Sequence, residues 1–295
     1  MYLNTLDVKL TPRTDVSSYN VDINESTLQI LSLILEFKLA SNCHIARFLT
    51  GQDQTKYIYR KLRFMWRAKL LESFKVLSGS STSLFYMLSK KGLKLLVESR
   101  RYEPRHLKNY PTAKTLLSWG LFKHEAEIVE LASLESLNKS ANLDINFKGE
   151  DSSQLQDFRD NKQIEALTPD YTVTYKTNQV ENKVYTEFER TRKSNEALLN
   201  KIQRYLDFSA PQDLQKHTLR LVFQTLGMER SFWLNIFLNR PSLLKLNILT
   251  TNLNLISGAK QFLEPIYASE STVKLNKDGP LKVEVSQRVK LFNFL

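Results

Sequence analysis

The 295-residue chain has few cysteines and glycines and no long apolar run. Its single cysteine, Cys43, excludes an internal disulfide and fits a reducing compartment. Its eight glycines form no Gly-rich phosphate loop, so a nucleotide-binding loop is not expected. The longest apolar run, residues 28–37, is too short to cross a bilayer. Because the first residues also show no basic-then-apolar signal pattern, we expect a cytoplasmic protein.

Positive charge is what the chain has in excess. It contains 42 Lys and Arg against 31 Asp and Glu, which gives a net charge of +11. With 42% hydrophobic and 11% aromatic residues, the composition is that of a globular protein with one large or two modest domains. A strongly basic balance indicates polyanionic partners, nucleic acid first and an anionic membrane second.

Residues 25–100 show the pattern of a helix-turn-helix followed by a β-hairpin and a closing helix. Gly51 is placed to end the second helix. Residues 71–76 and 84–88 are predicted strands around a Ser/Gly-rich tip. The residues predicted to cap the helices are Ser26, Ser41, Asp53 and Ser89. We therefore predict a winged helix over residues 25–100, preceded by a polar arm over residues 1–24 whose structure the sequence leaves open.

The third predicted helix, residues 54–68, carries the strongest functional signal. Its apolar residues follow helical spacing and predict a buried face. Its cations lie four, three and four positions apart and form one stripe nearly opposite that face: Lys56, Arg60, Arg63 and Arg67. The four cations of such a stripe repel one another. Duplex DNA supplies anions that offset this repulsion, and its major groove is wide enough for a helix. The alternative, a basic helix that is merely soluble, stays open.

The predicted DNA contacts come from this helix and the following hairpin. Residues near the helix start are suited to base edges or phosphates, and the hairpin adds a lysine. The predicted contact residues are Gln54, Lys56, Tyr59, Arg60, Arg63, Arg67 and Lys75. The predicted partner is double-stranded DNA. A membrane partner is disfavoured because the stripe lies on a winged helix and not on an amphipathic surface helix.

A basic linker is predicted over residues 101–111, where two prolines and several basic side chains interrupt regular structure. The predicted second domain, residues 112–295, opens with a long helix over residues 112–137. Strands are then expected near residues 143–147, 171–175, 184–189, 218–224 and 244–250, with helices over residues 194–208 and 229–239. This order predicts an α+β or α/β domain with a mixed central sheet. A last strand near residues 281–292 is predicted to extend the sheet edge or contact a partner.

Three carboxylates lie on the predicted central hairpin. Glu187 and Glu189 share one face of the second strand, and Asp170 begins the first. If the strands pair, the three side chains come close. Converging carboxylates bind Mg²⁺ or Mn²⁺, and such a metal can polarise a phosphodiester and activate water. The alternative is that they pair with the neighbouring Lys183, Arg190 and Arg192 on a solvated face.

Pro169-Asp170 followed by Glu187-Phe188-Glu189 resembles the PD-(D/E)-x-K nuclease arrangement. The longer series, from His124 through these residues and Arg190-Thr191 to Lys201-Ile202 and Tyr205, is similar to the replication-relaxation family. The resemblance covers most of the chain, roughly from the first helix to Tyr205. It implies a winged helix joined to a restriction-endonuclease-like domain, encoded largely on plasmids and integrating elements. The chain departs from the family pattern at Glu189, where Asp is common, and it has no lysine directly after Glu187.

Under this resemblance Asp170 and Glu187 hold Mg²⁺ or Mn²⁺, and Glu127 approaches the metal. Glu189 is then a third ligand or an outer-shell base, and Lys201 replaces the missing lysine in steadying phosphate charge. The implied function is DNA cutting or nicking in plasmid replication or mobilisation. The alternative is a catalytically inactive regulator or accessory factor whose second domain is a docking or dimerisation platform. The implied further partners are other replication or mobilisation proteins and, as an open alternative, a second copy in a homodimer.

Overall fold

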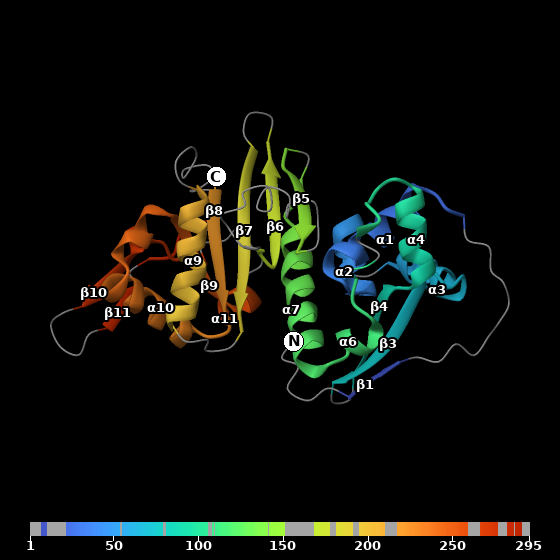
Figure 1. Ribbon diagram of the computed structural model, residues 1–295, viewed down its shortest axis with the longest axis horizontal. Coiled ribbons are helices and arrows are strands. Elements are labelled where there is room, and N and C mark those ends of the chain that lie inside the picture. Colours follow the sequence, from blue (N-terminus) through green and yellow to red (C-terminus); the bar gives the residue numbers. More distant parts are fainter. Residues whose placement is uncertain are drawn as a thin grey trace. The chain divides into compact units, whose positions relative to one another are not determined.

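The chain forms two compact units, each with a sheet and helices, so its fold is α+β (Figure 1). By residue contacts the units are Met1–Leu137 and Asn138–Leu295. The computed structural model describes residues 7–10, 22–53, 55–78, 81–105, 108, 110–140, 142–150, 168–177, 181–190, 195–209, 217–258, 266–276, 282–285 and 287–290. Within them no helix is long and apolar enough to cross a membrane.

The first unit follows the order helix, helix, helix, hairpin, helix (Figure 1). Its elements are α1 (Glu25–Phe37), α2 (Asn42–Thr50), α3 (Lys56–Arg67), β3 (Leu71–Ser78), β4 (Ser81–Leu88) and α4 (Lys90–Glu98). The hairpin is antiparallel throughout, from Leu71 opposite Leu88 to Ser78 opposite Ser81. Two short strands flank it, β1 (Asp7–Leu10) beside β3 and β2 (Ala40–Ser41) beside β4. Part of the polar arm therefore folds back as a strand, which the sequence had left open.

Two of the helix caps differ from the predicted ones. The side chain of Asn24, not Ser26, caps α1, and Thr55, not Asp53, caps α3. Cap-type residues are clustered at both helix starts, so the local pattern alone does not select among them. Ser41 and Ser89 cap α2 and α4 as predicted.

Glycine is favoured at one position of the first unit by its backbone conformation and at another by close packing. Gly51 ends α2 with a φ of 67°, in the left-handed region that favours glycine. Gly92, in α4, packs against the start of the hairpin, and a Cβ there would lie 2.3 Å from the carbonyl oxygen of Leu70. Any side chain at residue 92 would therefore push α4 away from the hairpin.

The segment predicted as a linker is tied to the first unit. The Tyr110 hydroxyl donates to the carbonyl oxygen of Lys38 at 2.6 Å and accepts from the Leu88 amide at 3.0 Å. The Tyr102 hydroxyl donates to Glu36 at 2.8 Å. These contacts fix the described part of residues 101–111 against α1 and β4.

The helix predicted over residues 112–137 is two helices, α6 (Ala113–Leu116) and α7 (Trp119–Ser136). The contacts of α7 place it in the first unit, whereas the sequence had placed it in the second. Phe122 packs edge-on against Phe74 and Phe85, with ring centroids 6.4 and 5.4 Å apart. Glu125 forms a buried ion pair with Lys38 at 2.8 Å. A sequence shows that a helix has an apolar face, but it does not show which part of the protein packs against that face.

The second unit is built on a mixed five-stranded sheet. Its strands are β5 (Asp144–Gly149), β6 (Tyr171–Lys176), β7 (Glu181–Glu189), β8 (His217–Phe223) and β9 (Asn247–Asn252), in that spatial order. β5, β6 and β7 are antiparallel to one another in turn, whereas β7, β8 and β9 are parallel. The mixed sheet that the sequence predicted is therefore confirmed.

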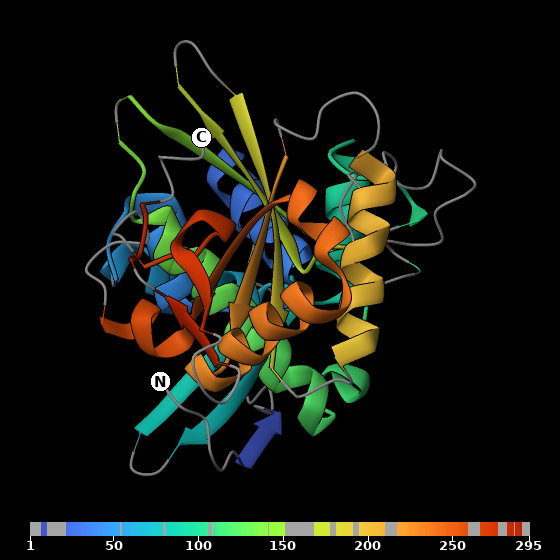
Figure 2. The same ribbon diagram turned by 90° about the vertical axis from the view of Figure 1, so that its left-hand side faces the viewer.

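Two helices cover one face of this sheet, α9 (Asn195–Ser209) and α10 (Leu226–Asn239). Figure 2 shows α10 in orange crossing in front of the strands and α9 in yellow-orange beside them. They connect successive parallel strands, α10 together with the 3₁₀ helix η1 (Pro241–Lys245). Their apolar side chains form one buried cluster with Tyr185, Leu219 and Leu221 of the sheet. This face is the one that carries the candidate site.

The remaining described elements follow β9. They are α11 (Leu253–Gly258), η2 (Glu270–Thr272), β10 (Val273–Asn276) and β11 (Lys282–Val285). β10 and β11 pair with each other in a separate two-stranded sheet. Of the two alternatives for the last predicted strand, extension of the central sheet is therefore wrong for residues 282–285, because they pair with a strand that the sequence pattern did not reveal, whereas contact with a partner stays a prediction.

Candidate functional site

Two carboxylates from neighbouring strands, Asp170 and Glu187, lie close together in the second unit. Tyr171 of β6 pairs with Thr186 of β7, so Asp170 follows in register opposite Glu187. The Oδ2 atom of Asp170 accepts the backbone N–H of Phe188 at 2.6 Å. This hydrogen bond fixes the Asp170 carboxylate against β7, beside Glu187.

Helix α9 supplies an ammonium group and a phenol to the same place. The Nζ atom of Lys201 donates to Oε2 of Glu187 at 2.5 Å. The hydroxyl of Tyr205 donates to Oε1 of Glu187 at 2.6 Å. Residues four apart share one helix face, so α9 holds both oxygens of this carboxylate at once. The structure thus brings Asp170, Glu187 and Lys201 together, and the catalytic roles given to them stay predictions.

The protonation of this cluster is set by burial and by charge. Burial raises the pKa of Glu187 to about 8, and the neighbouring Asp170 carboxylate raises it while Lys201 opposes the rise. Burial lowers the pKa of Lys201, but Glu187 and Asp170 more than offset this and raise it. Burial also raises the pKa of the Tyr205 phenol. A divalent cation beside the two carboxylates would favour the ionised form of Glu187.

The predicted metal ligands are distributed over both units. Glu189 is buried at the end of β7 and contributes to the negative field at Lys201. Glu127 lies on α7, in the first unit, and its metal role stays a prediction. Within the part of the chain that the structure describes, no group of three or more His, Cys, Asp or Glu side chains is arranged to hold a metal ion. Two adjacent carboxylates still fit Mg²⁺, which commonly takes one or two carboxylates and completes its shell with water and substrate phosphate.

The predicted cationic stripe of α3 is largely exposed. Lys56, Arg60 and Arg63 face solvent, and none of them forms an ion pair with another described residue. Arg67, in the last turn, is half-buried and contacts other residues. The opposite face buries Ile58, Leu62 and Met65. Because α3 contains no carboxylate, its exposed face carries positive charge only.

The other predicted DNA contacts are placed less uniformly. Tyr59 and Lys75 are exposed, on α3 and β3, and Gln54 lies outside the described residues. Strand β1 puts Lys9 opposite Lys75 in register. Lys9 was not among the predicted contacts, because nothing in its local sequence shows that the arm pairs with the hairpin.

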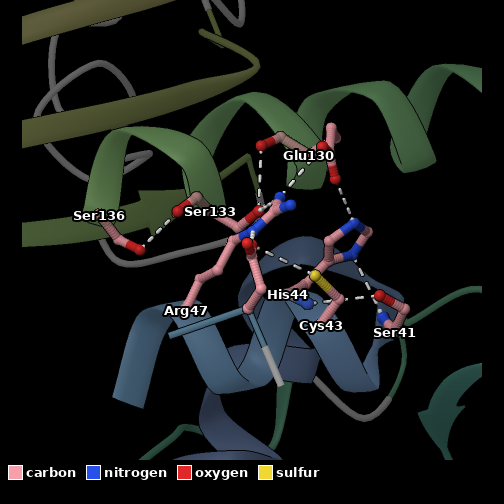
Figure 3. Close-up of polar contacts among 8 residues, drawn as sticks. Ser41, Cys43, His44, Arg47, Glu130, Ser133 and Ser136 are labelled. Carbon is pink, nitrogen blue, oxygen red and sulfur yellow. Dashed lines mark hydrogen bonds and ion pairs between the residues drawn. The ribbon is translucent and has the colours of Figure 1, made fainter. Parts of the chain in front are cut away.

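An ion-pair network between α2 and α7 was also missed (Figure 3). The Nε2 atom of His44 and a guanidinium nitrogen of Arg47 lie 2.8 and 3.0 Å from the two carboxylate oxygens of Glu130. The Ser41 amide donates to Nδ1 of His44, so the ring hydrogen lies on Nε2 and donates to Glu130. Arg47 also donates to Asp53 at 2.6 Å. Asp53 lies in the turn between α2 and α3. Because Arg47 donates to both Glu130 and Asp53, it connects this turn to α7.

The pKa of Glu130 predicts an acid-dependent loss of stability. Although burial raises it, the hydrogen bond from His44 and the charge and hydrogen bond of Arg47 lower it to about 2. A carboxyl with a depressed folded pKa stabilises the fold above its unfolded pKa, and that stability is lost as pH falls toward the folded pKa. We therefore expect the stability of the first unit to fall between about pH 4.5 and 2.

A Glu130→Gln variant should lack this pH dependence, as measured by thermal unfolding at a series of pH values. The Glu130 side chain is 37% exposed, so solvent screening limits the expected loss at pH 7 to roughly 1–2 kcal/mol. The control is Glu98→Gln, which removes an exposed ion pair with Lys94 and should change little. A Glu130→Gln profile that follows the wild-type profile would contradict the prediction.

Comparison with known proteins assigns the chain to a family. No curated protein and no solved structure matches it. A family model, described as replication-relaxation, matches residues 31–221. The matched range runs from α1 to β8 and contains the α3 stripe, Asp170, Glu187 and Lys201. Because this range is more than half of the 295 residues, the chain belongs to the replication-relaxation family.

Proposed function

We propose that the protein acts in plasmid replication or mobilisation, binds duplex DNA with its first unit, and carries a metal-dependent nuclease site in its second. The observation that carries the DNA-binding proposal is the exposed face of α3, where Lys56, Arg60 and Arg63 form no ion pair with another described residue. A helix gains little from such a row without an anion, and the phosphates of DNA supply it. The family supports the setting, replication or mobilisation.

The arrangement of the first unit supports a winged-helix mode of binding. α2 and α3 are joined by a short turn, and the β3–β4 hairpin and α4 follow. In a helix-turn-helix the second helix enters the major groove and its exposed side chains meet the bases and phosphates. α3 is then the recognition helix, and the β3–β4 hairpin, with the exposed Lys75, is the wing.

The second unit supports a restriction-endonuclease-like site. Asp170 and Glu187 lie on adjacent strands, and Lys201 reaches them from α9. Asp170 and Glu187 would hold Mg²⁺ or Mn²⁺, which supplies Lewis-acid polarisation of a phosphodiester when bound. Lys201 would stabilise the negative charge that develops on the phosphate. Tyr205 orients Glu187 through its hydrogen bond to Oε1.

The second candidate function is a regulator or accessory factor without nuclease activity. One observation favours it: both oxygens of Glu187 are already engaged by side chains of α9. The second unit would then serve as a platform for other replication proteins or for a second copy. A supercoiled plasmid that stays intact with Mg²⁺ and with Mn²⁺ would support this candidate.

We expect an Arg60→Ala, Arg63→Ala double variant to bind duplex DNA more weakly than the wild-type protein, because each side chain meets a phosphate. The slope of log affinity against log salt should fall by about two units. Fluorescence anisotropy with a labelled duplex over a salt series measures both quantities.

The control removes the same charge from the second unit. Lys274 and Lys282 are exposed on β10 and β11, and their double alanine variant should keep the wild-type slope. If the Arg60/Arg63 variant keeps the wild-type affinity and slope, α3 is not the DNA-binding element.

A further inference from the structure

Exposed aromatic side chains gather on α3. Tyr57, Tyr59 and Phe64 are 59%, 51% and 41% exposed. The other large apolar side chains that are exposed in the described part of the chain are aliphatic and lie elsewhere: Ile23, Leu137 and Leu238. The basic face of α3 is therefore also an aromatic face.

Phe64 continues the row of cations on this face. Lys56, Arg60 and Phe64 are spaced four residues apart, so each lies one turn beyond the last on the same side of the helix. Successive members are then about 6 Å apart along the axis. A ligand that lies along Lys56 and Arg60 and continues for one more turn therefore reaches the Phe64 ring. Such a ligand offers anions and an apolar group within one helical turn.

In duplex DNA, anions and an apolar group lie close together where a thymine faces the major groove. Its phosphates are the anions, and the C5-methyl of thymine is the apolar group on the major-groove edge of the bases. An aromatic side chain that contacts this methyl distinguishes thymine from the other bases. We infer that Phe64 is a specificity-determining residue that reads thymine methyls in the major groove. The inference rests on the proposed function and adds a base preference to it.

An anionic membrane surface also offers charge beside apolar groups, but the burial of α3 disfavours it. A helix that lies on a membrane inserts its main apolar face. In α3 that face is Ile58, Leu62 and Met65, each at most 1% exposed and committed to the protein core. The face left to solvent is cationic, with aromatic rings between the charges. This pattern fits a groove lined with phosphates and bases better than it fits a lipid layer.

The test removes the methyl and nothing else. The full chain is titrated by fluorescence anisotropy against a duplex of alternating adenine and thymine, and against the same duplex with deoxyuridine in place of every thymine. We expect the wild-type protein to bind the deoxyuridine duplex about fourfold more weakly for each methyl that is buried by the protein. Phe64→Ala should bind both duplexes equally, whereas Phe64→Leu, which keeps an apolar side chain, should keep a preference for thymine.

The matched control is Leu238→Ala, which removes an exposed apolar side chain of the second unit and should keep the full preference for thymine. Equal binding of both duplexes by the wild-type protein would overturn the inference and leave the DNA-binding proposal standing. A preference for thymine that persists in Phe64→Ala would also overturn it. Failure of the wild-type protein to bind either duplex would overturn the proposed function itself. Phe64-dependent binding to phosphatidylserine vesicles without a thymine preference would assign α3 to a membrane instead.

Discussion

A Glu187→Gln variant is expected to lose metal-dependent DNA cleavage by roughly a thousandfold or more. Glutamine has nearly the shape of glutamate, but it cannot supply the negative charge that a divalent cation needs. The buried site also leaves few substitutes, because Glu187 is 1% exposed and Asp170 is the carboxylate next to it. The measurement is the conversion of supercoiled plasmid to nicked or linear DNA with Mg²⁺ or Mn²⁺.

The matched control for this variant is Glu181→Gln, an exposed carboxylate on the same strand whose loss should leave cleavage unchanged. Binding of duplex DNA should survive in both variants, because α3 lies in the other unit. Because burial and Asp170 raise the pKa of Glu187, protons compete with the divalent cation for this carboxylate, so wild-type cleavage should fall as the pH is lowered. Cleavage by Glu187→Gln at the wild-type rate would place the nuclease site elsewhere.

A Glu229→Ala variant is expected to destabilise the second unit by about 3–5 kcal/mol. Glu229, on α10, is fully buried and receives both terminal nitrogens of Arg288, at 2.6 and 2.9 Å. Thr250 and Asn252, on β9, also donate to it at 2.7 and 2.8 Å. Removing the carboxylate leaves the largely buried guanidinium without its counter-charge, which costs more than the pair itself contributes. Urea unfolding followed by circular dichroism measures the loss.

The control for the stability measurement is Glu284→Ala, an exposed carboxylate on β11 that should change stability by less than about 0.5 kcal/mol. Arg288→Lys should give an intermediate loss, because lysine keeps the charge but not the paired hydrogen bonds. If Glu229→Ala unfolds at the wild-type urea concentration, the network does not hold the residues around Arg288 in place.

The features that could be predicted from the sequence are those whose cause is local. The helical spacing of α3 separates its buried residues from its cations within twelve positions. The alternation of residues in β6 and β7 predicts a hairpin, and that pairing alone brings Asp170 beside Glu187. The place of Lys201 on the next helix allows it to reach the hairpin, although only the structure shows that its Nζ atom donates to Glu187.

The features that escaped prediction depend on contacts between distant parts of the chain. Glu130 and Arg47 are 83 residues apart, and Glu229 and Arg288 are 59 apart. From the sequence, each of these charged side chains could equally have been exposed to solvent. The neighbouring residues do not show which distant side chain it pairs with when it is buried.

The strand order β1-β3-β4-β2 also bears on self-association. β1 pairs with the outer side of β3 from Asp7 opposite Leu77 to Leu10 opposite Phe74. Unpaired backbone groups at the border of a sheet recruit strands from other molecules, and proteins resist this with short, charged border strands. The border here is a four-residue strand, DVKL, with an acid and a base in its sequence. A dimer that joined two copies by adding a strand directly to β3 would first have to release β1.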